Sequence, residues 1–197
     1  MGEEVCFQAE KSKGEKTKYR LAEAIKECMK TTPVDDITIR QIAETCGVAR
    51  QTFYRNFLDK YDLINWYFDK LLLESFACMG SGGTVLEGLE RKFNYVLKER
   101  IFFGAAFRSD DQNSLKEHDF ELILDFYRNL IHEKTGRFPN EEISFLLEMY
   151  CRGSISMTVK WVLNGTKDSP RTLALLLVKA MPPALERLFS ELHILGC

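Results

Sequence analysis

Apolar residues recur at helical spacing along almost the whole chain. Leu21, Ile25 and Met29 follow one another four residues apart, and Leu122 and Phe126 repeat the spacing in the second half. This period places apolar side chains on one face of an α-helix, whereas a half-buried strand would need strict alternation. No segment alternates convincingly and no internal repeat stands out, so the sequence predicts an all-α fold.

Capping and breaking residues divide this pattern into about nine helices. Pro33 cannot continue a helix, Gly47 suits a left-handed residue after a helix, and the Gly/Ser run at 78–84 is a clear break. Pro182 and Pro183 are expected to kink the last helix. The expected helical segments are 17–30, 38–46, 50–56, 59 to the Gly/Ser break, 85–100, the short apolar piece 101–107, 114–134, 140–163 and 169–192.

Three parts are expected along the chain. Residues 1–15 are polar and lack periodicity, which indicates a flexible N-terminal arm. Residues 16–60 hold three short helices, and residues 61–197 form a larger helical body. No apolar run reaches the roughly 18 to 20 residues of a membrane span, and no secretory signal opens the chain. We therefore expect no membrane contact and a cytoplasmic location.

The net charge of −2 conceals an uneven distribution of charge along the chain. Residues 11–60 carry 11 basic and 7 acidic side chains, whereas residues 61–197 carry 16 basic and 19 acidic ones. A modestly basic block on an otherwise acidic body is typical of a part that contacts phosphates. A solvated, Lys-rich helix would give a similar count, so the charge alone does not decide.

The segment 37–64 has the physical features of a helix-turn-helix. Two expected helices are joined by a turn of about four residues built on Gly47, and Ile42, Val48 and Phe53 are expected to point inward. The second helix would then project polar side chains and, from 49 to 58, no acidic ones. Arginine and glutamine reach base edges in the major groove, while hydroxyls and amides suit phosphate oxygens. The projected residues are Arg50, Gln51, Thr52, Tyr54, Arg55 and Asn56.

Residues 17–68 resemble the DNA-binding domain of TetR-family transcriptional regulators. The family signature stands here as Thr38, Ile42, Ala43, Gly47, Val48, Thr52, Phe53, Tyr54, Phe57, Lys60 and Leu63. The resemblance implies phosphate contacts by Thr38, Thr52, Tyr54 and Lys60, base contacts by Arg40, Arg50, Gln51 and Arg55, and either role for Asn56. Ala49 departs from the pattern, because many relatives place a capping Ser or Thr there.

The resemblance also implies that the chain binds palindromic double-stranded DNA as a homodimer. The family usually dimerises through its last two helices, here 140–163 and 170–191, and the small residues Gly153, Ser154 and Ser156 would permit close approach. The alternative is that these apolar faces bury against the same subunit.

Regulators of this family often hold a small-molecule inducer among their middle helices, which makes 61–197 the expected effector domain. The candidates for the lining of such a pocket are aromatic residues at helical spacing, which are also common in a closed core. Two polar residues, Arg108 and His118, could anchor a ligand. The candidate lining residues are Trp66, Phe93, Phe102, Phe103, Phe107, Phe120, Phe126, Tyr127 and Trp161.

The run 50–68 and the type of C-terminal half further resemble regulators related to those of dihydroxyacetone kinase. In that branch of the family a partner protein can replace the small molecule as the signal.

Catalysis and metal binding are not expected. The six cysteines form no C-x-x-C pair and the chain has only three histidines, so neither a zinc site, a disulfide framework nor a cofactor is indicated. The run GSGGT lacks the Lys-Ser/Thr of a P-loop, and Asp110 and Asp111 are adjacent loop residues. The remaining rival is a helical adaptor whose helix-turn-helix binds protein, and its binding would not weaken with salt as DNA binding does.

Overall fold

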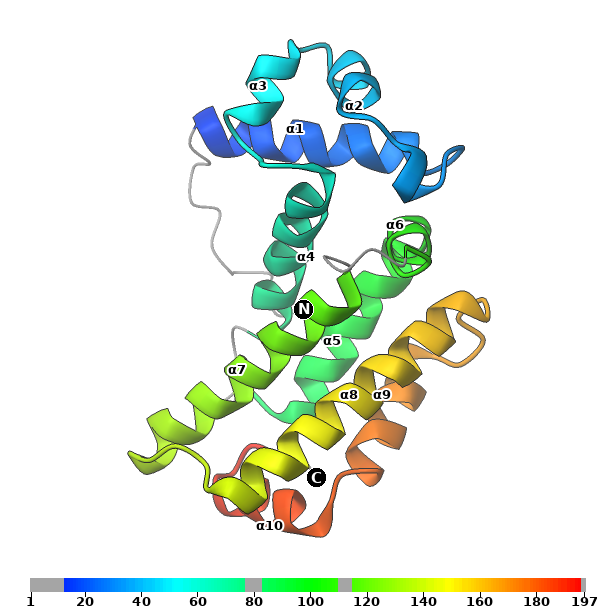
Figure 1. The fold of residues 1–197 in the computed structure, drawn as a ribbon. Helices are drawn as coiled ribbons and strands as arrows, with labels where there is room; N and C mark the ends of the chain where they lie inside the picture. The colour runs from blue at the N-terminus through cyan, green and yellow to red at the C-terminus, as the bar shows by residue number, and fades with distance from the viewer. Residues whose placement is uncertain (1–12, 77–82, 110–114, 196–197) are drawn as a thin grey trace, which may run out of the picture. The chain divides into compact units, whose positions relative to one another are not determined.

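The computed structural model describes residues 13–76, 83–109 and 115–195 (Figure 1). The elements in these ranges are helical, which confirms the all-α prediction. A 3-10 turn at Val34–Asp36 precedes the second helix. The α-helices are α1 (Lys13–Cys28), α2 (Ile39–Cys46), α3 (Arg50–Tyr54), α4 (Lys60–Phe76), α5 (Val85–Lys98), α6 (Arg100–Ala106), α7 (Leu115–Thr135), α8 (Glu141–Leu163), α9 (Pro170–Lys179) and α10 (Pro183–Glu191).

The described ranges hold ten α-helices instead of nine, because the two prolines break the last predicted helix. Helix α9 ends at Lys179, and α10 begins at Pro183 in the first helical position. A proline has no N–H to donate and its ring clashes with the preceding turn, so two in succession end a helix. Pro183 instead sits where a missing N–H costs nothing. Of the predicted arm 1–15, residues 1–12 lie outside the described ranges, and α1 already begins at Lys13.

The chain divides into two compact units, residues 1–67 and 68–197, and α4 begins in the first and ends in the second. In the first unit α1 packs on α2 and α2 packs on α3. Leu21, Ile25 and Ile42 are completely buried there. Trp66 closes this core, with its ring centroid 5.0 Å from Tyr19 and 5.6 Å from Phe57.

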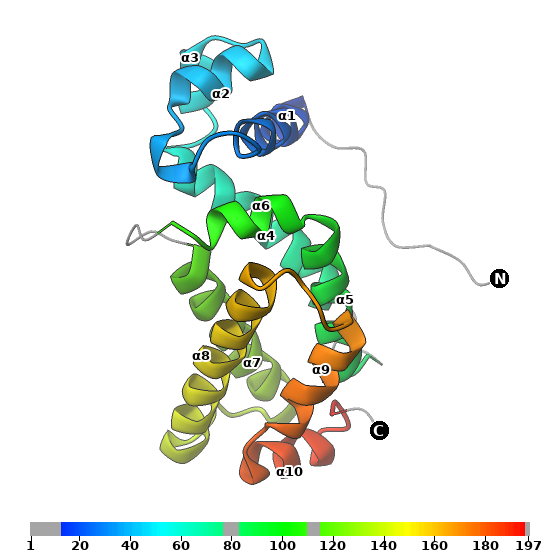
Figure 2. The ribbon, with the colours of Figure 1, turned by 90° about the vertical axis from the view of Figure 1, so that its right-hand side faces the viewer.

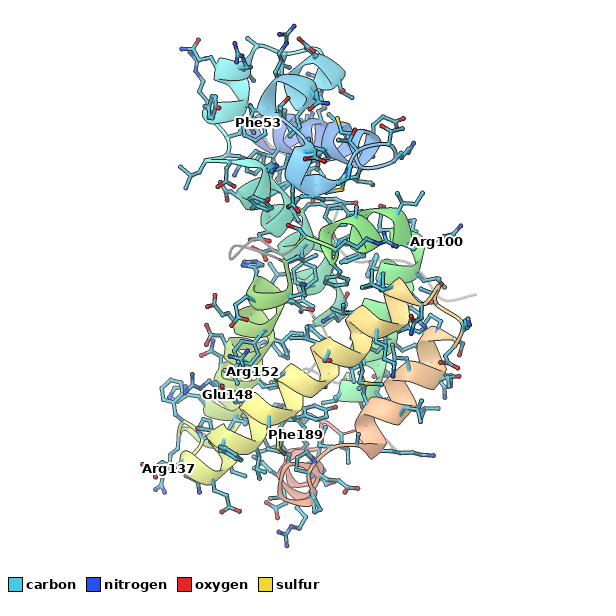
Figure 3. The ribbon with its side chains drawn as sticks, turned by 45° about the vertical axis from the view of Figure 1, so that its right-hand side comes forward. Phe53, Arg100, Arg137, Glu148, Arg152 and Phe189 are labelled. Carbon is cyan, nitrogen blue, oxygen red and sulfur yellow. The ribbon has the colours of Figure 1, made fainter. Side chains whose placement is uncertain are left out.

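The second unit is a helical bundle in which α5 lies along α9 and α7 lies along α8 (Figures 1 and 2). Helices α6 and α10 both contact α8. Aromatic rings fill the interior. Phe189 of α10, which is labelled in Figure 3, stacks on Tyr127 with ring centroids 5.4 Å apart. Among the helices within the described ranges, none combines enough length and apolarity to cross a membrane.

A buried ion pair joins α5 to α7 inside this bundle. The Lys92 ammonium donates to both carboxylate oxygens of Asp119 at 2.9 and 3.0 Å. Lys92 is 4% exposed and Asp119 is not exposed at all. Burial raises the pKa of the Asp119 carboxyl, and the ammonium of Lys92 opposes that rise because it favours the charged form. Each of these two buried groups therefore relies on the other to stabilise its charged form.

Candidate nucleic-acid interface

Local capping interactions define helix α2. The Thr38 hydroxyl accepts from the Gln41 backbone N–H at 3.2 Å, and the Gln41 side chain accepts from the Thr38 N–H at 2.8 Å. This reciprocal pair satisfies two N–H groups that have no partner inside the helix. At the other end Gly47 adopts φ +69°, and the Val48 N–H donates to Ala43 at 2.9 Å. Both features confirm the predicted start and turn of the motif.

Substituting Gly47 tests the left-handed turn alone, because a side chain at this position would not crowd any neighbouring atom. A Cβ built at this position would meet no atom within 4 Å, so only the backbone conformation opposes a side chain. We expect Gly47→Ala to lower the free energy of unfolding by about 1 to 2 kcal/mol, measured by urea denaturation. Gly47→Asn is the matched control and should cost less, because asparagine tolerates this conformation. Equal losses for the two variants would contradict this reasoning.

Helix α3 is short and is anchored by aromatic side chains. It follows Ala49, which is extended and provides no side-chain cap, as the departure from the family pattern suggests. Phe53 is completely buried (Figure 3), and its ring lies 5.9 Å from that of Phe57. The predicted end at 56 is two residues too late, because the Asn56 and Phe57 N–H groups both bond to the Phe53 carbonyl and close the last turn.

The opposite face of α3 projects from the first unit with little to restrain it. Arg50, Gln51 and Arg55 are exposed, and their side chains form no hydrogen bond or ion pair within the described ranges. Thr52 is half-buried. Tyr54 is 59% exposed, with the edge of its ring 5.7 Å from Phe53 between centroids. The face thus offers two guanidinium groups, an amide and two hydroxyls without any carboxylate.

Four of the other predicted contact residues have partners within the protein. Arg40 pairs with Glu44 at 2.7 Å on α2, and the Asn56 amide donates to the Thr52 carbonyl at 2.7 Å. The Lys60 ammonium donates to the backbone carbonyls of Asp35 at 2.6 Å and Ile37 at 3.0 Å, and Thr38 caps α2. Lys60 therefore holds the segment before α2 in place, a role that sequence reasoning missed because a backbone carbonyl leaves no mark in the sequence.

Within the described residues, the nine aromatic residues predicted to line an effector pocket are distributed over several separate contacts. Trp66 packs in the first unit, and Phe102, Phe103 and Phe107 pack among themselves in the second. The remaining contacts pair Phe93 with Trp161, Phe120 with Arg152 and Tyr127 with Phe189.

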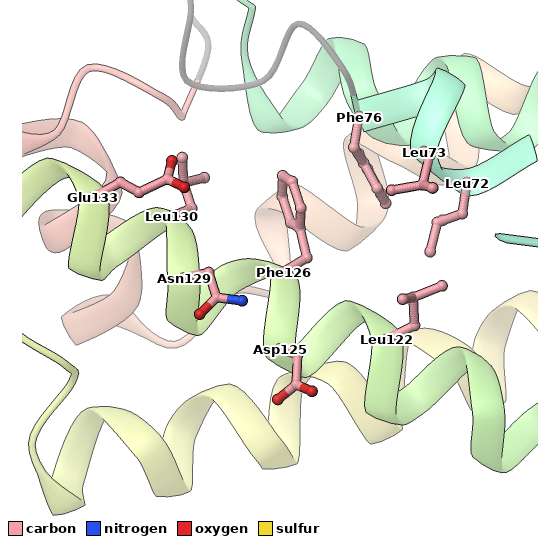
Figure 4. Close-up of a pocket in the computed structure, with 9 residues that line it drawn as sticks. All are labelled: Leu72, Leu73, Phe76, Leu122, Asp125, Phe126, Asn129, Leu130 and Glu133. Atoms are coloured by element: carbon pink, nitrogen blue, oxygen red, sulfur yellow. The ribbon is translucent and has the colours of Figure 1, made fainter. Parts of the chain in front are cut away.

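The sizes and linings of the cavities in the second unit indicate that most of these aromatic residues belong to a packed core. A space beside Phe93 and Tyr127 has a volume of about 10 Å³, which is barely enough for one water molecule. A larger pocket of about 400 Å³ lies between α4 and α7, and of the nine residues only Phe126 lines it (Figure 4).

Neither predicted ligand anchor is among the residues that line this pocket. The imidazole of His118 lies 2.5 Å from the Asp69 carboxylate, and this hydrogen bond raises the pKa of His118. Arg108 donates to the Gly104 carbonyl at 3.1 Å. Within the described ranges no group of three or more His, Cys, Asp or Glu side chains is arranged to hold a metal ion. The thiols of Cys28, Cys46 and Cys151 are free.

Comparisons with known proteins agree with this geometry. Residues 21–66 match the family model described as bacterial regulatory proteins of the tetR family, and residues 83–182 match the one described as a transcriptional regulator C-terminal region. A search of curated protein sequences found no significant match.

Several solved structures share the fold. The dihydroxyacetone kinase operon activator DhaS is 21% identical with a TM-score of 0.61, and the match covers 88% of this chain and 97% of that one. The regulator FadR from Bacillus subtilis, in complex with stearoyl-CoA, is 19% identical with a TM-score of 0.57, covering 87% and 97%. A tetR-family regulator from Streptomyces coelicolor is 15% identical with a TM-score of 0.61, covering 90% and 88%.

Proposed function

Because the chain belongs to the TetR family of bacterial transcriptional regulators, we propose that it binds a palindromic DNA operator as a homodimer. The observation that carries the proposal is the outer face of α3, where Arg50, Gln51 and Arg55 are exposed and unpaired within the described ranges. These side chains suit base edges, and Thr52 and Tyr54 suit phosphates. The family is one of regulators, not enzymes, and contact with the chromosome places the protein in the cytoplasm.

The remaining predicted contacts fit a supporting role at the same interface. Thr38 and Lys60 order the backbone around the start of α2, and Asn56 closes the end of α3. Lys60 can hold the carbonyls and still add positive charge beside a phosphate. Arg40 would have to leave Glu44 to reach DNA, and exposed pairs of this kind are weak enough to exchange.

The dimer half of the proposal is supported by an exposed apolar surface on α8 and α9. Phe145 is 68% exposed, Met149 51% and Met157 46%, and these residues follow a single stripe of α8 through Gly153. On α9, Leu176 is 53% exposed. A Cβ at Gly153 would meet nothing within 4 Å, which leaves room for a second copy to approach. Apolar patches of this kind usually mark interaction sites, and a twofold dimer buries the same patch on both subunits.

The second unit is proposed to carry the signal that controls DNA affinity, through a small molecule or a partner protein. The pocket between α4 and α7 supports a small molecule, because its volume falls within the usual range for ligand sites. Two structurally similar FadR regulators are described in complex with stearoyl-CoA and lauroyl-CoA. The partner alternative is the one implied by the resemblance to dihydroxyacetone-kinase regulators.

Selection of bound duplexes from a random pool tests the DNA proposal directly. A palindromic consensus, bound with affinity that falls steeply with salt, is the expected result because released counterions drive phosphate contacts. An adaptor that uses the same helices to bind protein would yield no consensus. It would also show no such salt dependence.

Substitutions on α3 should distinguish base-specific contacts from sequence-independent attraction to the DNA phosphates. Arg50→Ala and Arg55→Ala are each expected to reduce discrimination between the consensus and a substituted site by about 1 to 3 kcal/mol, because a bidentate guanine contact is lost. Fluorescence anisotropy on both duplexes measures this loss. Lys60→Ala should weaken both duplexes alike, and Arg187→Ala on α10 controls for the change in net charge. Equal weakening of both duplexes by the α3 variants would contradict the base-contact roles.

A further inference from the structure

The pocket between α4 and α7 is an apolar trough inside the second unit (Figure 4). Leu72 and Phe76 line it from α4, and Leu122, Phe126 and Leu130 line it from α7. The Phe76 and Phe126 rings stack with centroids 5.0 Å apart and planes inclined by 22°. A volume of about 400 Å³ suits one compact organic molecule.

The polar lining of this pocket carries charge of a single sign. Asp125, Asn129 and Glu133 recur every four residues on α7, and all three are exposed. Their side chains form no hydrogen bond or ion pair with another described residue. No lysine, arginine or histidine is among the lining residues. Two carboxylates that lack a cation therefore stand beside an aromatic and aliphatic floor.

We propose that this pocket binds lipophilic organic cations, and this inference rests on the proposed role of the second unit as effector domain. An aromatic ring attracts a cation over its face, and the two carboxylates add Coulomb attraction at the rim. The charge of an anionic ligand would be repelled by both carboxylates. The chemistry is thus opposite to that needed for the acyl-CoA ligands named for the FadR neighbours.

Two probes of nearly equal size and shape but opposite charge test the proposal. Tetraphenylphosphonium is expected to bind the full-length protein in isothermal titration calorimetry and to raise its melting temperature with concentration. Tetraphenylborate, its anionic counterpart, is expected to bind at least about tenfold more weakly, because the same apolar contacts are offset by the carboxylates. Equal binding of the two ions, or tighter binding of the borate, would overturn the proposal.

A double neutralisation locates the effect at the pocket. Asp125→Asn with Glu133→Gln is expected to weaken tetraphenylphosphonium binding by about fivefold to tenfold and to remove the preference over tetraphenylborate. The matched control is Glu186→Gln with Glu191→Gln, which changes the net charge equally on α10 and does not alter the pocket lining. Circular dichroism checks that each variant is folded. Equal weakening by both double variants would assign the effect to net charge and overturn the site.

Competition experiments examine the other occupants. Lauroyl-CoA and a basic amphipathic peptide are added to the protein loaded with tetraphenylphosphonium. Neither is expected to displace the cation at equal concentration. Displacement by lauroyl-CoA that becomes stronger in the Asp125→Asn, Glu133→Gln variant would identify the pocket as a lipid site and overturn the proposal. Displacement by the peptide would identify it as a protein-docking groove, with the same consequence.

These measurements are made without DNA, so they stand apart from the proposed operator binding. A protein that selects a palindrome but ignores tetraphenylphosphonium would overturn the cation site alone. A protein that binds the cation but no duplex would overturn the DNA proposal alone.

Discussion

Replacing Lys92 with methionine is expected to lower the free energy of unfolding by about 3 to 5 kcal/mol at pH 7, because it leaves a buried carboxylate without its partner. Asp119 is not exposed to solvent, and the ammonium of Lys92 bonds to both of its oxygens. Urea denaturation monitored by circular dichroism gives the change. The double variant Lys92→Met with Asp119→Leu is the control and should recover most of the loss, since apolar side chains of similar volume replace the whole pair.

The same variant should show a distinct dependence on pH. Without the ammonium, burial raises the pKa of Asp119 further above its ordinary value of 3.8. The folded variant then retains a proton that the unfolded chain releases, so its stability is greatest near or below pH 4 and falls as the pH rises. The deficit relative to the double variant should therefore shrink from pH 7 to pH 4. A deficit that is independent of pH would show that packing, not charge, explains the loss.

Leu176→Asp is expected to convert the protein to a monomer at micromolar concentration and to weaken operator binding by at least about 100-fold, or roughly 3 kcal/mol. Leu176 is 53% exposed on α9, within the apolar surface proposed to pair two subunits. A twofold interface would bury two new carboxylates, and an unpaired buried charge is very unfavourable. Sedimentation equilibrium measures the mass, and anisotropy measures the affinity.

Ile101→Asp provides the matched control for this test. Ile101 is 54% exposed on α6, so the substitution adds the same charge to a similarly exposed aliphatic position outside the proposed seam. This variant should remain dimeric and bind the operator normally. If Leu176→Asp also remains dimeric, the subunits associate through a different surface.

The start and end of most helices follow from residues that are close together in the sequence. Thr38 and Gln41 form the predicted capping box, and Gly47 takes the predicted left-handed conformation. Asn140 and Ser169 cap α8 and α9 as their positions predict. These interactions join residues within one turn, so a linear pattern of residue types is sufficient to predict them. The polar face of α3 was predictable for the same reason.

The pocket proposed to hold an effector was much less predictable. The aromatic residues chosen for it share a helical period, which identifies the buried face of each helix but not the helix that covers it. Most of these rings pack against other side chains, and the pocket lies beside Phe126, between α4 and α7. The polar residues that line it, Asp125, Asn129 and Glu133, were not among the predicted site residues, because polar residues on an exposed helix face are usually only solvated.

By itself the sequence determined the all-α class, the helix-turn-helix and its outward residues, because each depends on the spacing of neighbours along one helix or turn. Only the tertiary structure decided that Lys60 holds the carbonyls of Asp35 and Ile37 and that Lys92 meets Asp119, 27 residues away, inside the core. Both contacts join separate segments of the chain. A side chain's own sequence neighbours do not encode such a partner, because packing chooses it among all the faces that could be brought together.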